Sequence, residues 1–349
     1  MQTNLKNGAL LFFCSLGVLA CNGGGGSGNS PSYTGSVYMI LGNNSIQKCP
    51  VGGNQANMGN CQIINGNGLF ESPTAITFGE SGNYAYVTNQ NNTVTECTVD
   101  SSGLLNSCSQ MGANQSWFSS PSSIIVQNNI AYVANQNGTI AECNIANNGQ
   151  FSTCNVITTV VSFSSITANA SQLYGLTSPI LSSLYTCNLN NLDSGCTPVS
   201  FESSNPGMLI GSPFQIYYNN QQNLLYGAYS NSIISLGLLG GGIYGCTFSN
   251  PSSVSSCSTA YQLGGFIGVL PTSASIYTLT SDNMNNGYFI DYYENYNIIT
   301  QEVQQKGTFL NACNIGNDGS FNNCTMYQLN SDNLYFNTNG NLYIAYLNR

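Results

Sequence analysis

The sequence predicts an all-β protein assembled from repeated antiparallel hairpins, and its cysteines are the first observation that predicts this fold class. The chain holds 14 cysteines, and twelve of them fall into six pairs whose members are 9 to 12 residues apart. Each pair flanks a short segment of turn-forming residues, so both members can lie on one hairpin. The six pairs are Cys49/Cys61, Cys97/Cys108, Cys143/Cys154, Cys187/Cys196, Cys246/Cys257 and Cys313/Cys324.

The centres of three pairs carry a glycine after a small polar residue, namely Ser102-Gly103, Asn148-Gly149 and Asp318-Gly319. Such dipeptides are typical of two-residue hairpin turns, in which both residues adopt positive φ. Residues at equal distances from the turn then lie opposite each other, with Cα atoms about 4.5 to 5.5 Å apart, within reach of a disulfide. We expect six hairpins with one disulfide each. Metal binding by thiolates is the alternative, but the chain has no histidine and no CxxC pair.

A longer repeat encloses these hairpins and is the second observation. One copy runs over residues 72–108 and another over residues 120–154, and each contains four strand-like segments separated by turn residues. Their central tyrosines, Tyr86 and Tyr132, are 46 residues apart. Repeats of about 40 to 50 residues with four strands each are typical of the blades of a β-propeller.

The segment Ala85-Tyr86-Val87-Thr88-Asn89 resembles the YVTN family of β-propeller repeats, which is similar in form to NHL propellers. In that family a Ser-Pro strand precedes the Ala-Tyr-Val-Thr-Asn strand, and here Ser72-Pro73 and Ser120-Pro121 take that place. The resemblance covers residues 70–160, and weaker copies occur around Tyr38, Tyr174, Tyr226 and Tyr288. It implies a propeller fold, while alternation along the strand indicates that the tyrosines pack between blades.

The elements follow in order along the chain. Residues 1–20 are expected to be a signal peptide, because Lys6 precedes an apolar segment that ends at Ala20. Residues 21–32 form a Gly/Ser-rich tether, and residues 33–349 form the propeller domain. We expect six blades, with residues 341–347 completing the first blade, which begins near Ser36. Seven blades are the alternative, the seventh being built from residues 334–347 and 33–41.

The sequence Val18-Leu19-Ala20-Cys21 resembles the bacterial lipobox, which implies that Cys21 is acylated. Simple cleavage of the signal peptide is the alternative. Asn22 after the cysteine implies sorting to the outer membrane of a Gram-negative bacterium. The protein is therefore expected to be an outer-membrane lipoprotein, periplasmic or surface-exposed, that contacts the membrane through its lipid alone. Disulfides fit this oxidising compartment.

Composition excludes several functions. Charged residues make up only 5% of the chain, against about a quarter in typical proteins. Beyond the signal peptide the cations are Lys48, Lys306 and Arg349, against 13 acidic residues. Nucleic-acid binding needs clustered lysine and arginine, so it is not expected.

Catalysis is not expected either, and no cofactor or metal is predicted. The absence of histidine removes the usual general base and a common metal ligand. Two carboxylate pairs remain conceivable as acid and base. Asp291 and Glu294 are close in sequence, whereas Glu96 and Glu142 occupy equivalent repeat positions before their cysteines.

Two insertions interrupt the repeat, at residues 230–244 and 294–308. Loops carry the variable binding surfaces of rigid scaffolds, so these insertions are the candidate partner site, with Tyr244, Tyr296, Glu302 and Lys306 as candidate contacts. Longer hairpins without function are the alternative. The leading hypothesis is a non-catalytic module that binds or scaffolds an envelope or host protein. The alternatives are a glycan-binding adhesin and, less favoured, a metal-assisted hydrolase.

Overall fold

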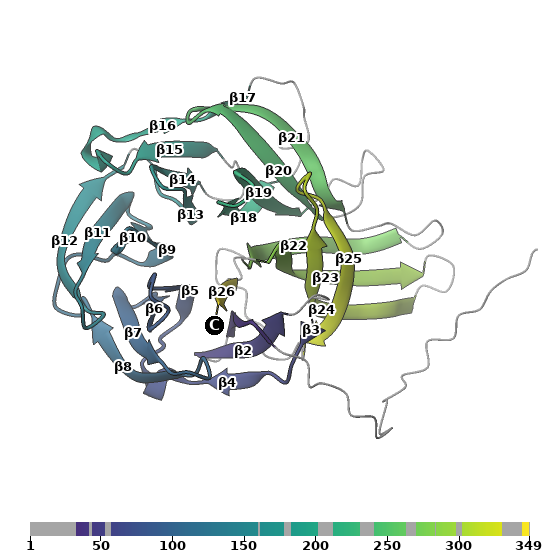
Figure 1. The fold of residues 1–349 in the computed structure, drawn as a ribbon, viewed down its shortest axis with the longest axis horizontal. Coiled ribbons are helices and arrows are strands. Elements are labelled where there is room, and N and C mark those ends of the chain that lie inside the picture. The colour runs from purple at the N-terminus through teal and green to yellow at the C-terminus, as the bar shows by residue number, and fades with distance from the viewer. Residues whose placement is uncertain are drawn as a thin grey trace, which may run out of the picture. The chain divides into compact units, whose positions relative to one another are not determined.

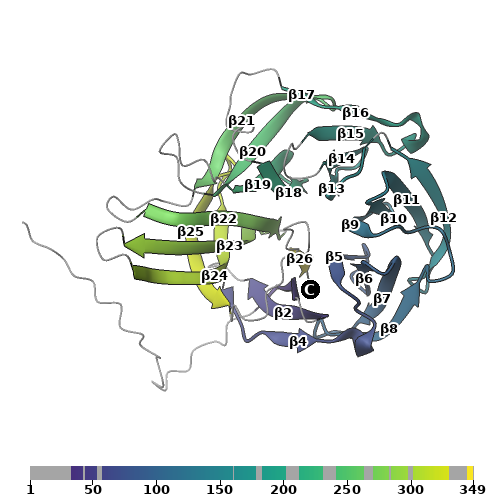
Figure 2. The same ribbon diagram turned by 180° about the vertical axis from the view of Figure 1, so that it is seen from behind.

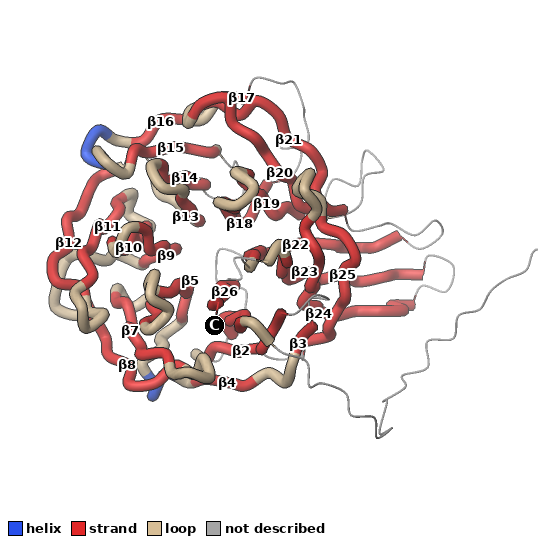
Figure 3. The backbone as a smooth tube through the Cα atoms, viewed as in Figure 1, coloured by secondary structure: helices blue, strands red, loops and turns tan. Residues whose placement is uncertain are grey.

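Six blades of largely antiparallel strands are arranged around a central axis and form a β-propeller (Figure 1). In Figure 3 strands joined by loops and turns make up the ring, and the only helical segments among the described residues are two short 3-10 turns, η1 (Gly66–Gly68) and η2 (Leu192–Ser194). The computed structural model describes residues 33–41, 44–52, 57–159, 161–177, 183–201, 212–230, 241–262, 270–282, 284–297, 302–329 and 344–348. The expected signal peptide, the tether and Cys21 lie outside these residues.

The first three blades come from the N-terminal half of the chain, except for one strand. Blade 1 consists of β26 (Ile344–Asn348), β1 (Gly35–Leu41), β2 (Ser45–Gly52), β3 (Asn57–Met58) and β4 (Gln62–Ile64). Blade 2 consists of β5 (Pro73–Phe78), β6 (Tyr84–Asn89), β7 (Thr93–Val99) and β8 (Leu105–Met111). Blade 3 consists of β9 (Pro121–Gln127), β10 (Ile130–Asn135), β11 (Thr139–Ile145) and β12 (Phe151–Thr158).

The last three blades follow the same order, and blades 5 and 6 are joined by one residue pair between Ser230 and Ser275. Blade 4 consists of β13 (Ser165–Ala168), β14 (Gln172–Leu176), β15 (Leu184–Asn188) and β16 (Cys196–Pro198). Blade 5 consists of β18 (Ser212–Asn219), β19 (Leu224–Ser230), β20 (Gly242–Asn250), β21 (Ser253–Gln262) and the parallel strand β17 (Ser200–Phe201). Blade 6 consists of β22 (Leu270–Ser281), β23 (Asn286–Asn297), β24 (Glu302–Ile315) and β25 (Phe321–Leu329).

The two ends of the domain meet in blade 1. Strand β26 pairs antiparallel with β1, with Ser36 opposite Leu347 and Tyr38 opposite Ala345. On its other side β1 pairs with β2. The C-terminal strand therefore completes the first blade, which confirms six blades and excludes the alternative seventh.

All six predicted disulfides are present, about one in each blade. In blades 2 to 6 the disulfide joins the third strand to the fourth, and in blade 1 it joins β2 to the residue before β4. The linked Cα atoms are 4.0 to 4.3 Å apart, slightly closer than expected. The pairing inferred from spacing is confirmed for Cys49–Cys61, Cys97–Cys108, Cys143–Cys154, Cys187–Cys196, Cys246–Cys257 and Cys313–Cys324.

The two cysteines of a disulfide differ in burial. The first cysteine of every pair is at most 1% exposed, because it lies on the third strand of its blade, which has a neighbouring strand on both sides. The second cysteine lies at the outer side of the blade, and in five of the six blades it is only partly buried. The partly buried sulfurs belong to Cys61, Cys108, Cys154, Cys257 and Cys324, whereas Cys196 is buried.

The turn type inferred from sequence is wrong. In blade 3 the Gly149 amide donates to the Ala146 carbonyl, and the Ala146 amide donates to the Gln150 carbonyl. The loop therefore has three residues, and only its glycine, with φ of 83°, lies in the left-handed region. Blades 2 and 6 use the same loop, which ends at Gly103 and Gly319 respectively.

This loop explains a bulge close to each of these three disulfides. A three-residue loop places an odd number of residues between opposed positions, but a separation of 11 leaves an even number between the cysteines. One strand must therefore hold one extra residue. The register accordingly shifts between Asn144 and Ile145 in blade 3, and equivalent shifts occur in blades 2 and 6.

The bulge corrects the expectation that the cysteines of blades 2 and 6 lie directly opposite each other. In blade 2 the register skips Cys97, which faces both Ser107 and Cys108 of the outer strand. Ser107 has a φ of 44°, so the bulged strand passes through the left-handed region there. Blade 6 repeats this arrangement, with Asn323 at a φ of 50° beside Cys324.

Direct opposition is confirmed in blades 3, 4 and 5. The register pairs the two cysteines of each of these blades, including Cys246 with Cys257. Blade 1 differs again, because Cys61 lies between β3 and β4, one residue before the ladder of β4 begins. A disulfide therefore closes every blade, but the strand geometry around it varies from blade to blade.

The repeated tyrosines are the largest buried side chains, and they pack between blades as expected. Tyr38, Tyr86, Tyr132, Tyr174, Tyr226 and Tyr288 are all at most 2% exposed. Three of them also donate to the hairpin glycine of the next blade: the hydroxyl of Tyr38 lies 2.5 Å from the Gly103 carbonyl oxygen, that of Tyr86 lies 2.8 Å from Gly149, and that of Tyr226 lies 3.0 Å from Gly319. The tyrosine and glycine of the repeat thus form one contact between neighbouring blades.

The asparagine at the end of the motif fixes the chain that enters its blade. The Asn89 side-chain oxygen accepts from the Glu71 amide at 3.1 Å, and its nitrogen donates to Thr95 at 2.9 Å. Asn135 repeats this arrangement with the Ser119 amide at 3.0 Å. Local hydrogen bonding and blade contacts therefore account for the motif's polar residues.

Candidate functional site

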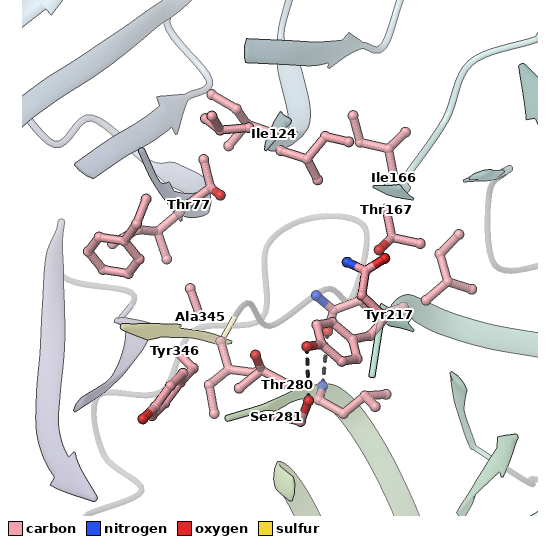
Figure 4. A pocket seen from close by; sticks show the side chains of 18 residues that line it. Thr77, Ile124, Ile166, Thr167, Tyr217, Thr280, Ser281, Ala345 and Tyr346 are labelled. Carbon is pink, nitrogen blue, oxygen red and sulfur yellow. Dashed lines mark hydrogen bonds between the residues drawn. The ribbon is translucent and has the colours of Figure 1, made fainter. Parts of the chain in front are cut away.

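The innermost strands of all six blades surround a central cavity of about 450 Å³ (Figure 4). These strands are β26, β5, β9, β13, β18 and β22, and their labels ring the centre in Figure 1 and, from behind, in Figure 2. The volume lies in the range of about 300 to 1,000 Å³ that is usual for small-molecule sites. This cavity was not among the sites predicted from sequence.

Half of the residues that line the cavity are aliphatic, including Ile76, Ile124 and Ile166 on successive blades. Its polar groups are hydroxyls, amides and phenols: Thr77, Thr167, Gln215, Tyr217, Asn220, Thr280, Ser281 and Tyr346. Among the described residues that line the cavity there is no Asp, Glu, Lys or Arg. The cavity therefore suits an uncharged ligand better than an ion.

One end of the cavity has an organised polar group. The hydroxyls of Tyr217 and Ser281 lie 2.9 Å apart, and the Asn219 side-chain nitrogen donates to Ser281 at 3.3 Å. Burial raises the pKa of Tyr217, so its phenol stays protonated and can donate or accept a hydrogen bond. Figure 4 shows Tyr217 and Ser281 on the same side of the cavity.

On the innermost strands, side-chain oxygens accept hydrogen bonds from backbone amides that have no partner strand. Ser123 accepts from the Ile166 amide at 3.1 Å, Gln215 accepts from the Leu279 amide at 3.2 Å, and Thr278 accepts from the Ile344 amide at 3.1 Å. Each acceptor belongs to the blade before the one that holds the donor. These bonds occupy backbone donors that would otherwise face the cavity.

The second predicted insertion is a continuation of blade 6. Strands β23 and β24 extend as an antiparallel ladder in which Glu294 pairs with Lys306 and Asn297 with Glu302, with a shift of register between Asn295 and Tyr296. Strand β22 extends beside them, with Leu270 opposite Tyr296. The result is a three-stranded sheet that projects outward from the ring (Figures 1 and 2).

Three of the four candidate contacts, Tyr296, Glu302 and Lys306, lie in this projecting sheet. Of the strand pairings that the structure describes, those of β24 residues 302–307 involve β23 alone, because β25 pairs with β24 only from Thr308 onward. This stretch therefore forms an edge of the described sheet.

The first insertion falls largely outside the described residues, which resume at residue 241. Its last residue, Tyr244, is half-buried in β20, between Gly227 and Thr259 in register. There it packs against the core between blades 4 and 5. The structure thus brings Tyr296, Glu302 and Lys306 into one sheet and places Tyr244 in another blade.

The carboxylates considered for catalysis are dispersed. Glu96 and Glu142 lie in separate blades, each opposite the repeated tyrosine. Burial raises the pKa of both, and Asp193 raises the pKa of Glu142 further. Glu96 also accepts a hydrogen bond from Ser109 at 3.0 Å.

Asp291 is completely buried in blade 6, and its charge acts on Tyr261 of blade 5. Burial raises the pKa of Asp291 to about 7, an effect that nearby Asn311 partly offsets. Neither carboxyl oxygen has a hydrogen bond of normal geometry, and both polar side-chain atoms of Asn311 are also unsatisfied. Within the described part of the chain, no group of three or more Cys, His, Asp or Glu side chains could hold a metal.

Comparisons with known proteins assign no function to the chain. No family model matches it, and no curated protein matches it. A Bacteroides fragilis protein assigned as a 6-phosphogluconolactonase has a TM-score of 0.48 at 10% identity, covering 92% of this chain and 100% of that one. The Cps50 (Swd1) propeller domain of Myceliophteria thermophila has a TM-score of 0.44 at 9% identity, covering 75% and 89%. The computationally designed Ika8 protein has a TM-score of 0.37 at 10% identity, covering 74% and 71%.

The structure also bears on the compartment. Six disulfides indicate that the domain folds in an oxidising environment outside the cytoplasm. Among the described residues, no helix has the length and apolar character needed to cross a membrane.

Proposed function

We propose that this protein is a non-catalytic scaffold of the bacterial envelope that binds a partner protein. The observation that carries this proposal is the three-stranded sheet that projects beyond the ring at blade 6 (Figure 1). A disulfide-closed propeller is a rigid support, and this sheet presents the edge of β24 away from it. Such an edge suits an extended segment of a partner, because a strand can be added through backbone hydrogen bonds.

The charge pattern agrees with a protein partner. The edge segment begins at Glu302 and has Lys306 near its other end, with Val303, Gln304 and Gln305 between them. A partner strand could meet one charge of each sign, which would set its direction along the edge. We therefore assign the affinity to the backbone of residues 302–307 and the orientation to these two side chains.

A deletion tests the partner site. Replacing residues 293–307 with Asn-Gly joins Tyr292 to Thr308, which are already paired. We expect this variant to lose the partner captured from envelope extracts by the intact domain, and to keep its thermal unfolding temperature. A variant with both Glu302 and Lys306 changed to alanine retains the backbone edge, so it should bind more weakly without losing the partner. Full binding by the deletion variant would contradict the proposal.

The proposed location is the outer membrane of a Gram-negative bacterium, with the domain held by a lipid on Cys21. The support is the lipobox-like sequence before a flexible Gly/Ser tether. Cys21→Ala should abolish labelling by a fatty-acid probe, while Cys14→Ala, seven residues earlier in the apolar segment, should leave it intact. Persistent labelling of Cys21→Ala would show that the anchor lies elsewhere.

A further inference from the structure

A second hollow of about 390 Å³ lies at the boundary between blades 2 and 3. One wall is the turn that joins β5 to β6, and the other is the hairpin loop that joins β11 to β12. Its volume falls within the range of about 300 to 1,000 Å³ found for small-molecule sites. We refer to it as the inter-blade groove.

The inter-blade groove is lined mainly by uncharged polar groups. Asn83, Asn129 and Asn147 contribute three side-chain amides, and Glu80 contributes a carboxylate. The Asn129 side-chain nitrogen donates to the Ile145 carbonyl at 2.9 Å, which holds the amide in place with its oxygen left to accept. In the part of the chain that the structure describes, no lysine or arginine lines the groove, so these residues offer no positive charge to a phosphate, sulfate or carboxylate.

An aromatic ring forms part of the same wall. Tyr84 is half-buried, and its ring lies against Gly149 of the next blade, where any side chain would collide with it. Its hydroxyl is 3.4 Å from the Asn147 carbonyl oxygen. The ring therefore packs against the neighbouring blade and forms part of the groove wall, where it can serve as a stacking surface.

The boundary between blades 5 and 6 shows what closes this space elsewhere in the ring. There the four-residue turn after Asn219 carries Gln222, whose nitrogen donates to the Gly316 carbonyl at 2.9 Å and whose oxygen accepts from Tyr226 at 2.6 Å. In blade 2 the same position of the turn is Gly82, which has no side chain to make this link. The position of Tyr84 is likewise taken by Leu224 in blade 5.

We propose that the inter-blade groove binds a residue of a neutral carbohydrate. Each sugar hydroxyl can donate one hydrogen bond and accept up to two, so sugars can pair with amides, a carboxylate and backbone carbonyls at close quarters. The C–H face of a pyranose can pack on the Tyr84 ring, as apolar groups do on aromatic surfaces. The groove thereby adds a glycan subsite that is independent of the projecting sheet of blade 6.

The test uses the intact domain, residues 33–349, and three neutral trisaccharides: chitotriose, cellotriose and maltotriose. Calorimetry should detect binding of at least one. Tyr84→Leu copies the residue of blade 5, and it should weaken that binding at least tenfold. Tyr185→Leu is the matched control, because Tyr185 is also a half-buried strand tyrosine but lies outside the groove. The Tyr185→Leu variant should bind the sugar with the affinity of the wild type.

Three further arms sharpen the result. Glu80→Gln should weaken binding through the loss of a strong acceptor, and a glucuronate trisaccharide should bind less well than the neutral sugars because Glu80 repels it. The deletion of residues 293–307 should leave sugar affinity unchanged, which separates this site from the partner site. Absence of binding by all three neutral sugars would overturn the proposal, and so would an undiminished affinity of the Tyr84→Leu variant.

Discussion

Tyr86 shows how a single side chain of the repeat joins two blades. Its ring is buried and stacks with Phe151 of blade 3 at a centroid distance of 5.2 Å. Its hydroxyl reaches the Gly149 carbonyl, and burial together with the charge of Glu96 raises its pKa, so it remains a donor. The residue therefore combines apolar packing with one buried hydrogen bond across the blade boundary.

Removing that hydroxyl should have a measurable effect. Tyr86→Phe removes the hydrogen bond to the buried Gly149 carbonyl and leaves that acceptor less well satisfied. We therefore expect a loss of about 1 to 2 kcal/mol in the free energy of unfolding. Tyr84→Phe is the control, because that hydroxyl is exposed and its contact is 3.4 Å long. Denaturant titration of both variants measures the difference, and equal stabilities would contradict the role given to the Tyr86 bond.

Asp291 should make the stability fall as the pH rises. Its pKa is about 3.8 in the unfolded chain and about 7 when buried. Between these values the unfolded state loses a proton that the folded state keeps, so the free energy of unfolding decreases by an amount on the order of 4 kcal/mol. Asp291→Asn should remove much of this dependence and be more stable than the wild type at pH 8.

The measurement is chemical denaturation from pH 4.5 to pH 8. Asp100 does not titrate in this window, because hydrogen bonds from Ser102 and its neighbours lower its pKa to about 2. Glu96→Gln serves as a comparison, since burial raises the pKa of Glu96 as well. If Asp291→Asn retained the pH dependence of the wild type, burial of that carboxyl would not be its source.

At the scale of elements, the cysteine hairpin is the unit that the sequence defines best. The spacing of cysteines around a turn sufficed to predict all six disulfides. It could not distinguish a two-residue loop from a three-residue loop, because Asn-Gly and Asp-Gly are compatible with both. The two loops differ by one residue in the register of the strands that they join. Bulges close to Cys108, Cys154 and Cys324 absorb that difference, so the pairing was right although the turn type was wrong.

One disulfide should be dispensable for the fold. Changing both Cys143 and Cys154 to alanine frees a loop of 11 residues, so stability should fall by about 3 kcal/mol in the chain-entropy model. The blade retains its ladder and its Tyr86 contact, and circular dichroism should show an unchanged β spectrum. Loss of the β spectrum at room temperature would mean that the disulfide is required to specify the blade.

The projecting sheet illustrates the opposite case at the same scale. Residues 294–308 interrupt the repeat, and the sequence predicted an insertion there with candidate contacts. Its strands β23 and β24 pair with each other, and β23 also pairs with the extended end of β22 at residues 270–275. A local pattern does not contain that pairing, so a loop and an extended hairpin could not be told apart from the sequence.

At the scale of the whole molecule, the cavity and the inter-blade groove arise from closure of the ring. Residues such as Ile76 and Ile344 are far apart in sequence and line one cavity because six blades complete a circle. The inter-blade groove likewise depends on the boundary between two blades, because Gly82 has no side chain to bridge blades 2 and 3 as Gln222 bridges blades 5 and 6. Repeat analysis could predict the blades, but the spaces between them required their arrangement in three dimensions.

Closure itself should be the most sensitive feature of the molecule. Strand β26 supplies the inner strand of blade 1, and Ile344 and Leu347 are buried in the cores on its two sides. Truncation after residue 343 would expose the edge of β1 and open both cores, so the chain should lose its sharp thermal transition and elute as aggregates in size-exclusion chromatography. A peptide of residues 341–349 added in trans should partly restore the transition. Removal of Arg349 alone is the control and should leave it unchanged. A truncated chain that stays monomeric and unfolds like the intact one would show that five blades and an open sixth are sufficient.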